Sequence, residues 1–158
     1  MEDLRKEFEK MGFDWVETFI QSWNVVFKSL IGDTRKLEGI IENNLSAAFE
    51  YKCRALVRSH EEMIEIAKNF PEIFNDAEWK HNIMFLSKAI DSDDILKEFT
   101  VKQDIDQINY HKGVLFWSAK LNSLSISAMM KLASKKEYQD MTVRNINTTT
   151  KILALMNK

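Results

Sequence analysis

The sequence predicts an all-α fold, and three observations favour it. Its 158 residues include only four Gly and one Pro, which is too few for the turns of a loop-rich β protein. Apolar residues recur at the spacing i, i+3, i+4, i+7, as they do on one face of a helix. Several of these stretches begin with a polar residue followed three positions later by Glu, the pattern of a capping box. A chain of this length suits a single domain, residues 1–158, with about seven helices.

The first two expected helices lie near the N-terminus. We expect a short helix over residues 3–11 and a longer amphipathic helix over residues 14–30. Asp14 and Glu17 fit a capping box at the start of the longer helix, and Gly32 can adopt the left-handed conformation that ends it. The expected apolar face of this helix consists of Val16, Phe19, Ile20, Trp23, Val26, Phe27 and Leu30.

Three further helices are expected in the middle of the chain. The helical spacing of apolar residues continues over residues 37–56. The Ser-x-x-Glu pattern at residues 59–62 predicts the start of another helix, which Pro71 stops. The Asn-x-x-Glu pattern at residues 75–78 predicts a third helix, over residues 79–90.

Two long helices are expected to complete the fold. The acidic run at residues 91–94 suits the positive end of a helix dipole and predicts a helix that continues to about residue 122. A last helix is expected over residues 125–157. The unequal helix lengths favour an irregular helical packing over a regular four-helix bundle.

Composition excludes several classes of function. The net charge of −2 comes from 24 acidic and 22 basic residues mixed along the chain, so no basic stripe is available to bind nucleic acid. Cys53 is the only cysteine, which excludes an internal disulfide and favours a cytoplasmic protein. No uninterrupted apolar run approaches the roughly 18 residues of a membrane span.

The motifs do not predict an enzyme or a metal protein. Glu78 and His81 have the Glu-x-x-His spacing of a di-iron site, but a second such pair is missing. The acidic run after residue 90 lacks the Gly and Glu that a calcium loop needs. The chain has no Gly-x-Ser-x-Gly elbow and no cluster of glycines for a phosphate. We therefore expect a protein without catalytic activity.

The stretch INYHKGVLFW, residues 108–117, raises the question of haem. His81 and His111 are 30 residues apart, close to the separation of the two haem-facing histidines of globins. A proximal histidine belongs on a short helix that two long helices follow, whereas His111 is expected inside the first long helix. We therefore expect no haem.

The order of elements resembles that of globin-like sensor domains that have lost haem. It is a short N-terminal helix, the stretch FDWVETFIQSWNVVFKSL, several short helices and two long ones. More narrowly, the chain resembles the sensor domains of sporulation histidine kinases of the Bacillus group and their stand-alone plasmid-encoded relatives. That resemblance implies a globin-like packing with an internal tunnel for a fatty acid and a chloride ion. It also implies a homodimer through the last two helices and inhibition of sporulation by capture of the kinase's signal.

The residues suggest which side chains would line such a tunnel. Flat and adaptable side chains suit an apolar ligand chamber, and a few basic groups can face a carboxylate or a halide. Arg54 and His111 are the basic candidates. The apolar candidates are Trp23, Phe27, Phe49, Phe85, Phe99, Ile108 and Leu115. The alternative function is a helical interaction or lipid-surface protein, phasin-like or a viral signalling antagonist, which would expose its apolar stripe.

Overall fold

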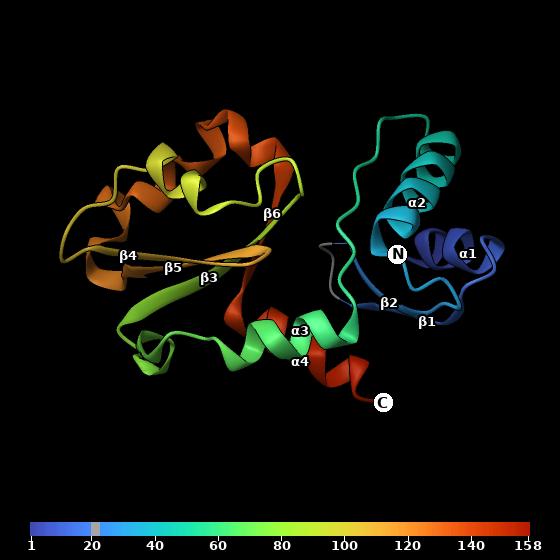
Figure 1. The fold of residues 1–158 in the computed structure, drawn as a ribbon, viewed down its shortest axis with the longest axis horizontal. Coiled ribbons are helices and arrows are strands. Elements are labelled where there is room, and N and C mark those ends of the chain that lie inside the picture. The colour runs from blue at the N-terminus through green and yellow to red at the C-terminus, as the bar shows by residue number, and fades with distance from the viewer. Residues whose placement is uncertain (20–22) are drawn as a thin grey trace. The chain divides into compact units, whose positions relative to one another are not determined.

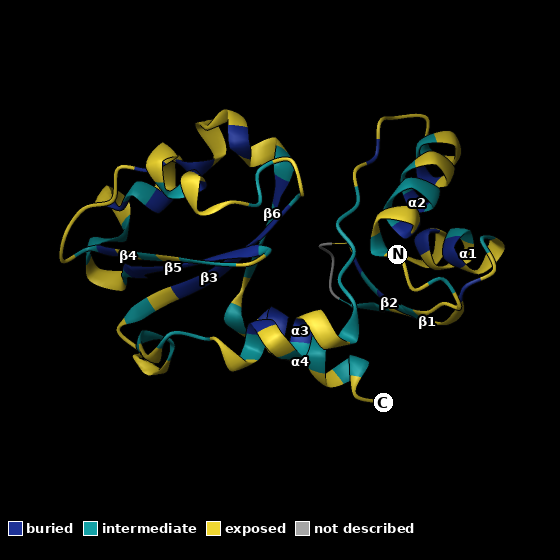
Figure 2. Cartoon of the chain, viewed as in Figure 1, coloured by how far each residue is buried: buried dark blue, intermediate teal, exposed yellow. Residues whose placement is uncertain are grey.

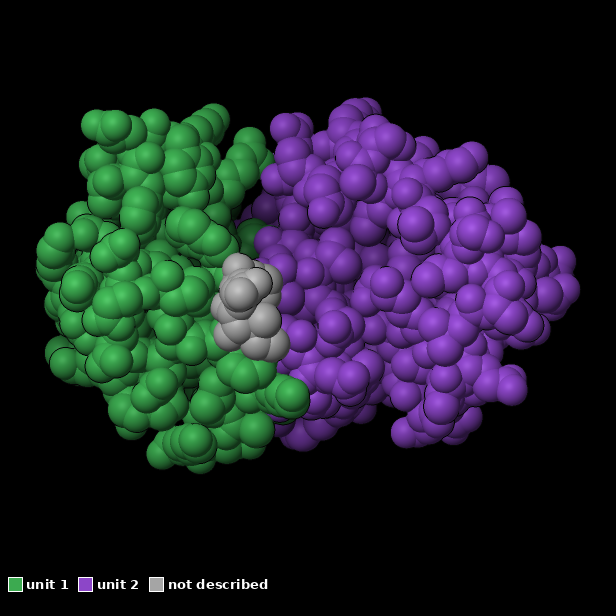
Figure 3. Space-filling model, turned by 180° about the vertical axis from the view of Figure 1, so that it is seen from behind, with its two compact units in different colours: residues 1–63, 151–158 green, residues 64–150 purple. Residues whose placement is uncertain are grey.

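β-Strands form much of the buried interior of this protein, as a computed structural model shows for residues 1–19 and 23–158. The prediction of an all-α, globin-like fold is wrong, because the structure is mixed α/β, with one two-stranded and one four-stranded antiparallel sheet. The chain divides into two units, residues 1–63 with 151–158 and residues 64–150 (Figure 3). Each unit has its own cluster of buried apolar side chains.

Unit 1 combines a β-hairpin with two helices (Figure 1). Its elements are α1 (Glu2–Lys10), β1 (Asp14–Phe19), β2 (Asn24–Lys28) and α2 (Thr34–Phe49). The rings of Phe8 and Phe13 pack on Phe27, with centroids 5.3 and 4.5 Å away. The buried cluster of unit 1 consists of Leu4, Phe8, Phe13, Val16, Leu37, Ile41, Leu45 and Cys53.

The helix expected over residues 14–30 is replaced by the β1–β2 hairpin. The segment is rich in Val and aromatic residues, which favour strands over helices. The apolar residues of β1 and β2 show a helical spacing only when the two strands are read as one continuous segment. Trp15 has a φ of 48° beside an irregularity in the β1–β2 register. Ile20, part of the expected helix face, lies outside the described residues.

Unit 2 is built on a four-stranded antiparallel sheet with the strand order β4-β5-β3-β6. The strands are β3 (Trp79–Leu86), β4 (Asp106–His111), β5 (Val114–Lys120) and β6 (Met141–Asn145). The 3-10 helix η1 (Glu72–Asn75) precedes β3, and further 3-10 helices lie between the strands: η2 (Asp93–Glu98), η3 (Leu121–Ile126), η4 (Ala128–Ser134) and η5 (Lys136–Asp140). The helices α3 (His60–Lys68) and α4 (Ile146–Met156) each include residues of both units.

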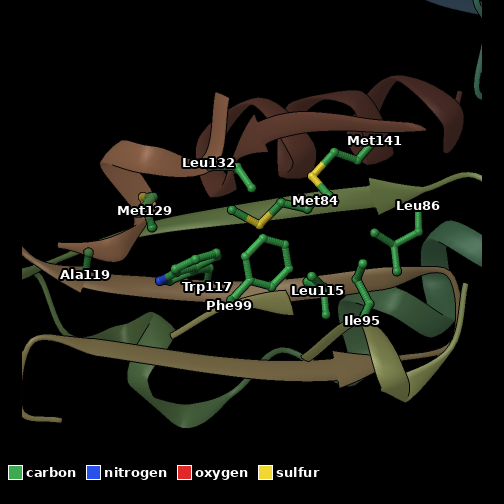
Figure 4. Close-up of a cluster of buried hydrophobic side chains, with 10 residues drawn as sticks. All are labelled: Met84, Leu86, Ile95, Phe99, Leu115, Trp117, Ala119, Met129, Leu132 and Met141. Carbon is green, nitrogen blue, oxygen red and sulfur yellow. The ribbon is translucent and has the colours of Figure 1, made fainter. Parts of the chain in front are cut away.

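The two central strands of this sheet, β3 and β5, are buried along most of their length (Figure 2). Trp117, for example, has no exposed surface and packs edge to face against Phe99 of the loop after η2. On the other face, Phe116 meets Phe70 and Phe74. The larger cluster, shown in Figure 4, comprises Met84, Leu86, Ile95, Phe99, Leu115, Trp117, Ala119, Met129, Leu132 and Met141.

The helices expected over residues 79–90 and 94–122 are wrong over most of their length, and the helix expected over residues 125–157 is divided into the 3-10 helices η4 and η5, the strand β6 and the α-helix α4. Residues 79–90 contain β3, and residues 94–122 contain most of η2 together with β4 and β5. Strands covered on both faces are apolar at nearly every position, so the alternation that marks a strand is missing. The dimer interface expected between the last two helices therefore loses its structural basis.

Local signals were predicted more successfully. The short N-terminal helix is confirmed as α1, and the capping box before α3 is confirmed at both bonds. The Ser59 N–H donates to Glu62 Oε2 at 2.7 Å, and the Glu62 N–H donates to Ser59 Oγ at 3.2 Å. No helix within residues 1–19 and 23–158 is long and apolar enough to cross a membrane.

Candidate functional site

An extended segment, residues 52–58, follows α2 in unit 1. The helix ends because Glu50 adopts a left-handed conformation, with φ of 55°. Beyond it, Cys53 is buried in the cluster of unit 1, and Ala55 and Val57 pack against that cluster. The odd-numbered residues of the segment therefore face the interior, as alternate residues of a strand do.

Side chains of α2 bind one edge of this segment. Residues 38, 42 and 46 are four positions apart, so they form one stripe along the helix. Each accepts a backbone N–H of the segment at 2.9 Å: Ser46 Oγ from Cys53, Glu42 Oε1 from Ala55 and Glu38 Oε1 from Val57. The segment thus has the backbone of a strand, but the hydrogen bonds of this edge come from a helix.

The opposite edge is different. The N–H and C=O groups of successive residues in an extended chain point to opposite sides, so those of Leu56 point away from the α2 stripe. Within the described part of the chain, neither backbone group of Leu56 has a hydrogen-bond partner, and no strand pairs with residues 52–58. Leu56 is half-buried. A half-buried residue of extended backbone, Leu56, to which no described strand pairs, is the feature that distinguishes this segment.

The outward face of the segment is basic. Its even-numbered residues are Lys52, Arg54, Leu56 and Arg58, and the segment contains no acidic residue. Lys52 and Arg54 are exposed, and Arg58 is half-buried. Sequence analysis missed this segment because Cys53 and Leu56 also continue the helical spacing of α2. The alternation of charged and apolar residues over 52–58 was the signal for a strand.

A buried Ser–His pair lies in the sheet of unit 2. The Nε2 atom of His81 is 2.8 Å from the carbonyl oxygen of Asp76, which can only accept, so Nε2 carries a hydrogen. Nδ1 therefore accepts the hydroxyl of Ser118, at 2.8 Å. This is the geometry of a nucleophile and its base. However, Ser118 is only 1% exposed and the ring of Phe74 packs against His81, so we assign the pair a structural role.

A buried carboxylate joins three parts of unit 2. Asp106 Oδ1 accepts hydrogen bonds from Trp117 Nε1 and the Ser127 hydroxyl, and Oδ2 accepts from the backbone N–H groups of Ala128 and Lys102. Burial raises the pKa of the Asp106 carboxyl, but these hydrogen bonds outweigh burial and leave the pKa below its usual value. With four donors satisfied, the carboxylate stabilises the fold and has little capacity left for a ligand.

The turn between β4 and β5 is held by another carboxylate. Asp91 Oδ1 accepts the Tyr110 hydroxyl at 2.9 Å and the Gly113 N–H at 2.8 Å. Burial, together with this bond to Asp91, raises the pKa of Tyr110 to about 12. His111, the histidine of the apolar stretch, ends β4 and stacks on Phe116, with ring centroids 6.3 Å apart. His111 thus lies at the turn of the β4–β5 hairpin and not inside a long helix.

The residues predicted to line a ligand tunnel fall in both units. Four lie in unit 1 and five in unit 2: Trp23, Phe27, Phe49 and Arg54 in the first, and Phe85, Phe99, Ile108, His111 and Leu115 in the second. Trp23 is exposed, packs edge to face on Phe49 and has a φ of 56°. Phe99, Ile108 and Leu115 are part of, or pack against, the large cluster of unit 2. Their role in ligand binding stays a prediction.

Over residues 1–19 and 23–158, no three His, Cys, Asp or Glu side chains come together in a way that could hold a metal ion. Glu78 lies in the turn before β3 and His81 lies in β3, so their Glu-x-x-His spacing does not place them on one face of a helix.

Comparisons with known proteins agree with the mixed fold. The family model described as "Protein of unknown function (DUF1697)" matches residues 1–116. The solved structure of the conserved bacterial protein SP0830 from Streptococcus pneumoniae is similar to this chain, with a TM-score of 0.86 and 24% sequence identity. The match covers 100% of this chain and 89% of that one, and it shows the shared fold. No curated protein matches this chain.

These findings overturn the resemblance to haem-free globin-like sensor domains. That resemblance depended on helix order and length, and the helices it required are largely strands. The family match spans most of the chain, including all of α1, β1, β2 and α2 and the candidate segment 52–58. The chain therefore belongs to the DUF1697 family of proteins of unknown function.

Proposed function

We propose that this protein is a non-enzymatic binding module and that unit 1 binds an extended polypeptide as an added β-strand. The site is the edge of residues 52–58 that faces away from α2. The observation that carries the proposal is the backbone of Leu56, whose N–H and C=O have no partner among the described residues although the residue is half-buried. Addition of a strand to an exposed sheet edge is a recurrent mode of peptide recognition.

The energetics of the segment support this proposal. A fully buried N–H or C=O without a partner costs about 1–3 kcal/mol of desolvation, and a bound strand would recover a part of this cost at the half-buried Leu56. The segment is already fixed in an extended conformation by the three α2 side chains, so binding orders little of the protein. The only paired strands described in unit 1 are β1 and β2, and two strands alone form a marginally stable sheet.

Other functions have less support. The fatty-acid, chloride and kinase-signal predictions depended on a tunnel within a globin-like fold, and they remain untested. The homodimer is equally untested. Catalysis by the Ser118–His81 pair would require exposure of a hydroxyl that is 1% exposed. A helical interaction or lipid-surface protein was the alternative expectation, and the Leu56 backbone, which has no partner among the described residues, gives an interaction a specific site.

The proposal can be tested with synthetic strands. A fluorescein-labelled peptide of seven residues, in which Val alternates with Thr, is titrated with the protein and followed by fluorescence anisotropy. We expect saturable binding that is lost when the amides along one edge of the peptide are N-methylated, because methylation removes the hydrogen bonds of that edge. Hydrogen exchange should show that the Leu56 amide becomes protected when the peptide binds. Unchanged exchange at Leu56, or equal affinity for peptides methylated on either edge, would contradict the proposal.

A protein variant provides a second test. Leu56→Pro removes the N–H that the added strand would bind, while the odd-numbered amides that pair with α2 are unchanged. Leu56→Ala is the matched control, because it shortens the side chain and keeps the N–H. We expect Leu56→Ala to bind the peptide and Leu56→Pro to bind it at least tenfold more weakly. Circular dichroism of both variants checks that unit 1 remains folded.

A further inference from the structure

The strand β4 is an outer strand of the sheet in unit 2. The strand order is β4-β5-β3-β6, so β4 pairs with β5 on one side. No strand described in the structure pairs with its other side. The burial of the two strands agrees with this position, because six of the seven residues of β5 are buried, whereas Asp106 is the only buried residue of β4.

The register of the β4–β5 pair shows which backbone groups point outward. The Lys120 N–H donates to the carbonyl oxygen of the opposite residue, Ile105, at 2.9 Å, so these two form a hydrogen-bonded pair. Bonded and non-bonded positions alternate along an antiparallel pair. The odd-numbered residues of β4 therefore bond to β5, and the backbone groups of Ile108 and Tyr110 point away from it. Among residues 1–19 and 23–158, these outward N–H and C=O groups have no hydrogen-bond partner.

The strand lacks the features that commonly keep edges from pairing. Edge strands are often protected by a Lys, a Pro or a bulge. The register of β4 with β5 is regular, and its sequence, DQINYH, contains neither Lys nor Pro. Its one carboxylate, Asp106, is buried and accepts four hydrogen bonds within unit 2. The edge therefore presents no exposed carboxylate or ammonium group of its own to a second strand.

The sequence of β4 is complementary to itself. If two copies pair antiparallel about Asn109, Ile108 of each copy lies opposite Tyr110 of the other, and Gln107 lies opposite His111. Opposite residues of paired strands point to the same face of the sheet. Apolar side chains thus meet apolar ones on one face, and polar side chains meet polar ones on the other.

The charges at the two ends of the strand are complementary as well. Residues 102–106, at its beginning, contain two acids and one base, whereas the turn after the strand contains Lys112. In a pair centred on Asn109, the Lys112 end of each copy lies beside the Asp106 end of the other. Opposite charges on neighbouring strands stabilise pairing.

We infer that β4 is the interface of a two-fold symmetric homodimer, in which two copies of the strand pair antiparallel about Asn109. The N–H groups of Ile108 and Tyr110 in each copy donate to the carbonyl oxygens of Tyr110 and Ile108 in the other. The two four-stranded sheets thereby become one continuous sheet. A two-fold axis requires a surface that fits itself, and β4 meets this requirement in both polarity and charge. The interface is independent of the Leu56 edge in unit 1.

Sedimentation equilibrium of the full chain tests the dimer and measures its dissociation constant. We expect a reversible equilibrium between monomer and dimer. Asn109→Lys should weaken the dimer about tenfold, because two like charges then lie directly opposite each other at the symmetry axis. Gln107→Lys is the matched control, since Gln107 is also exposed and points to the same face. Its opposite residue is His111, so the control should still dimerise at about pH 8, where histidine is neutral.

A mixing experiment locates the symmetry axis. Asn109→Asp alone should also weaken the dimer, because two carboxylates then face each other. An equal mixture of the Asn109→Lys and Asn109→Asp proteins should form heterodimers at least as tight as the wild-type dimer, because opposite charges meet at the axis. Homodimers of Asn109→Lys as tight as those of Gln107→Lys would overturn a pairing centred on Asn109.

The backbone bonds can be tested separately from charge. Ile108→Pro removes an N–H that points away from β5, so it should weaken the dimer at least tenfold while the sheet stays folded. Ile108→Val is the matched control, because it keeps both the N–H and a branched apolar side chain. Circular dichroism checks the fold of both variants. In the wild type, hydrogen exchange of the Ile108 and Tyr110 amides should slow as the protein concentration rises, whereas the Gln107 amide, which bonds to β5, should be protected at every concentration.

The outcomes distinguish the possible occupants of this edge. A wild-type protein that stays monomeric at all concentrations would overturn the homodimer, as would a dimer that neither Asn109→Lys nor Ile108→Pro weakens. A dimer lost in Leu56→Pro and kept in Ile108→Pro would move the interface to segment 52–58 and overturn it too. Protection of the Ile108 amide by the Val–Thr peptide, in a protein that stays monomeric, would assign the edge to a peptide instead of a second copy.

Discussion

Replacing the buried carboxylate of Asp106 with an amide should destabilise unit 2 strongly. In Asp106→Asn the side-chain oxygen can still accept two of the four hydrogen bonds, from Trp117 and Ser127. The NH₂ group would then face the N–H groups of Ala128 and Lys102, and donors cannot pair with donors. Two unsatisfied amides at about 2 kcal/mol each give a loss of about 4 kcal/mol in the free energy of unfolding.

The same carboxylate predicts a pH dependence with a definite sign. The folded-state pKa of Asp106 lies below its ordinary value, because its hydrogen bonds outweigh the effect of burial. Such a group contributes its stability above the unfolded-state pKa of about 3.9 and loses it as the pH falls through the folded-state pKa. Part of the acid destabilisation of the wild type should therefore be missing in Asp106→Asn.

Urea unfolding followed by circular dichroism measures both effects, at pH 7 and in steps down to about pH 3. Asp104→Asn is the matched control, because Asp104 is exposed two residues earlier and Asn tolerates its φ of 66°. The control should change stability by less than about 0.5 kcal/mol. A loss below 1 kcal/mol in Asp106→Asn, or the same acid profile as the wild type, would refute the assigned role of the carboxylate.

Three further predictions concern single residues. Glu50→Gly should raise the free energy of unfolding by about 1 kcal/mol, because Gly adopts the φ of 55° at this position without strain. Glu50→Ala should not raise it, and thermal denaturation of both variants measures the difference. Ser118→Ala should cost about 1–2 kcal/mol in urea unfolding by leaving His81 Nδ1 unpaired, and unchanged stability would contradict that bond. Tyr110 should remain protonated at about pH 11 in ultraviolet titration, and Asp91→Asn should lower its pKa from about 12; titration near pH 10 in the wild type would count against this.

Features that depend on a few neighbouring residues could be predicted from the sequence. The capping box of Ser59 and Glu62 satisfies amides within its own first turn, so no distant contact is needed to form it. The helix α1 is equally local, with Leu4 and Phe8 on one face. By contrast, β3 and β5 pair over a long sequence separation, and both faces of each are covered by other segments. Their nearly continuous apolar runs are compatible with a buried helix as well as a buried strand.

The sequence by itself determined the mixed charge, the lone cysteine, α1, α3 and its cap, because each follows from composition or from contacts within one turn. The tertiary structure decided that Cys53, Ala55 and Val57 leave the helical path and lie against a shared core. It also decided that α2 binds one edge of this segment and that the Leu56 backbone, on the other edge, has no partner within residues 1–19 and 23–158. The physical reason is that the spacing of apolar residues determines which side chains are buried. Strand pairing and exposed edges depend instead on which distant segments supply the hydrogen bonds.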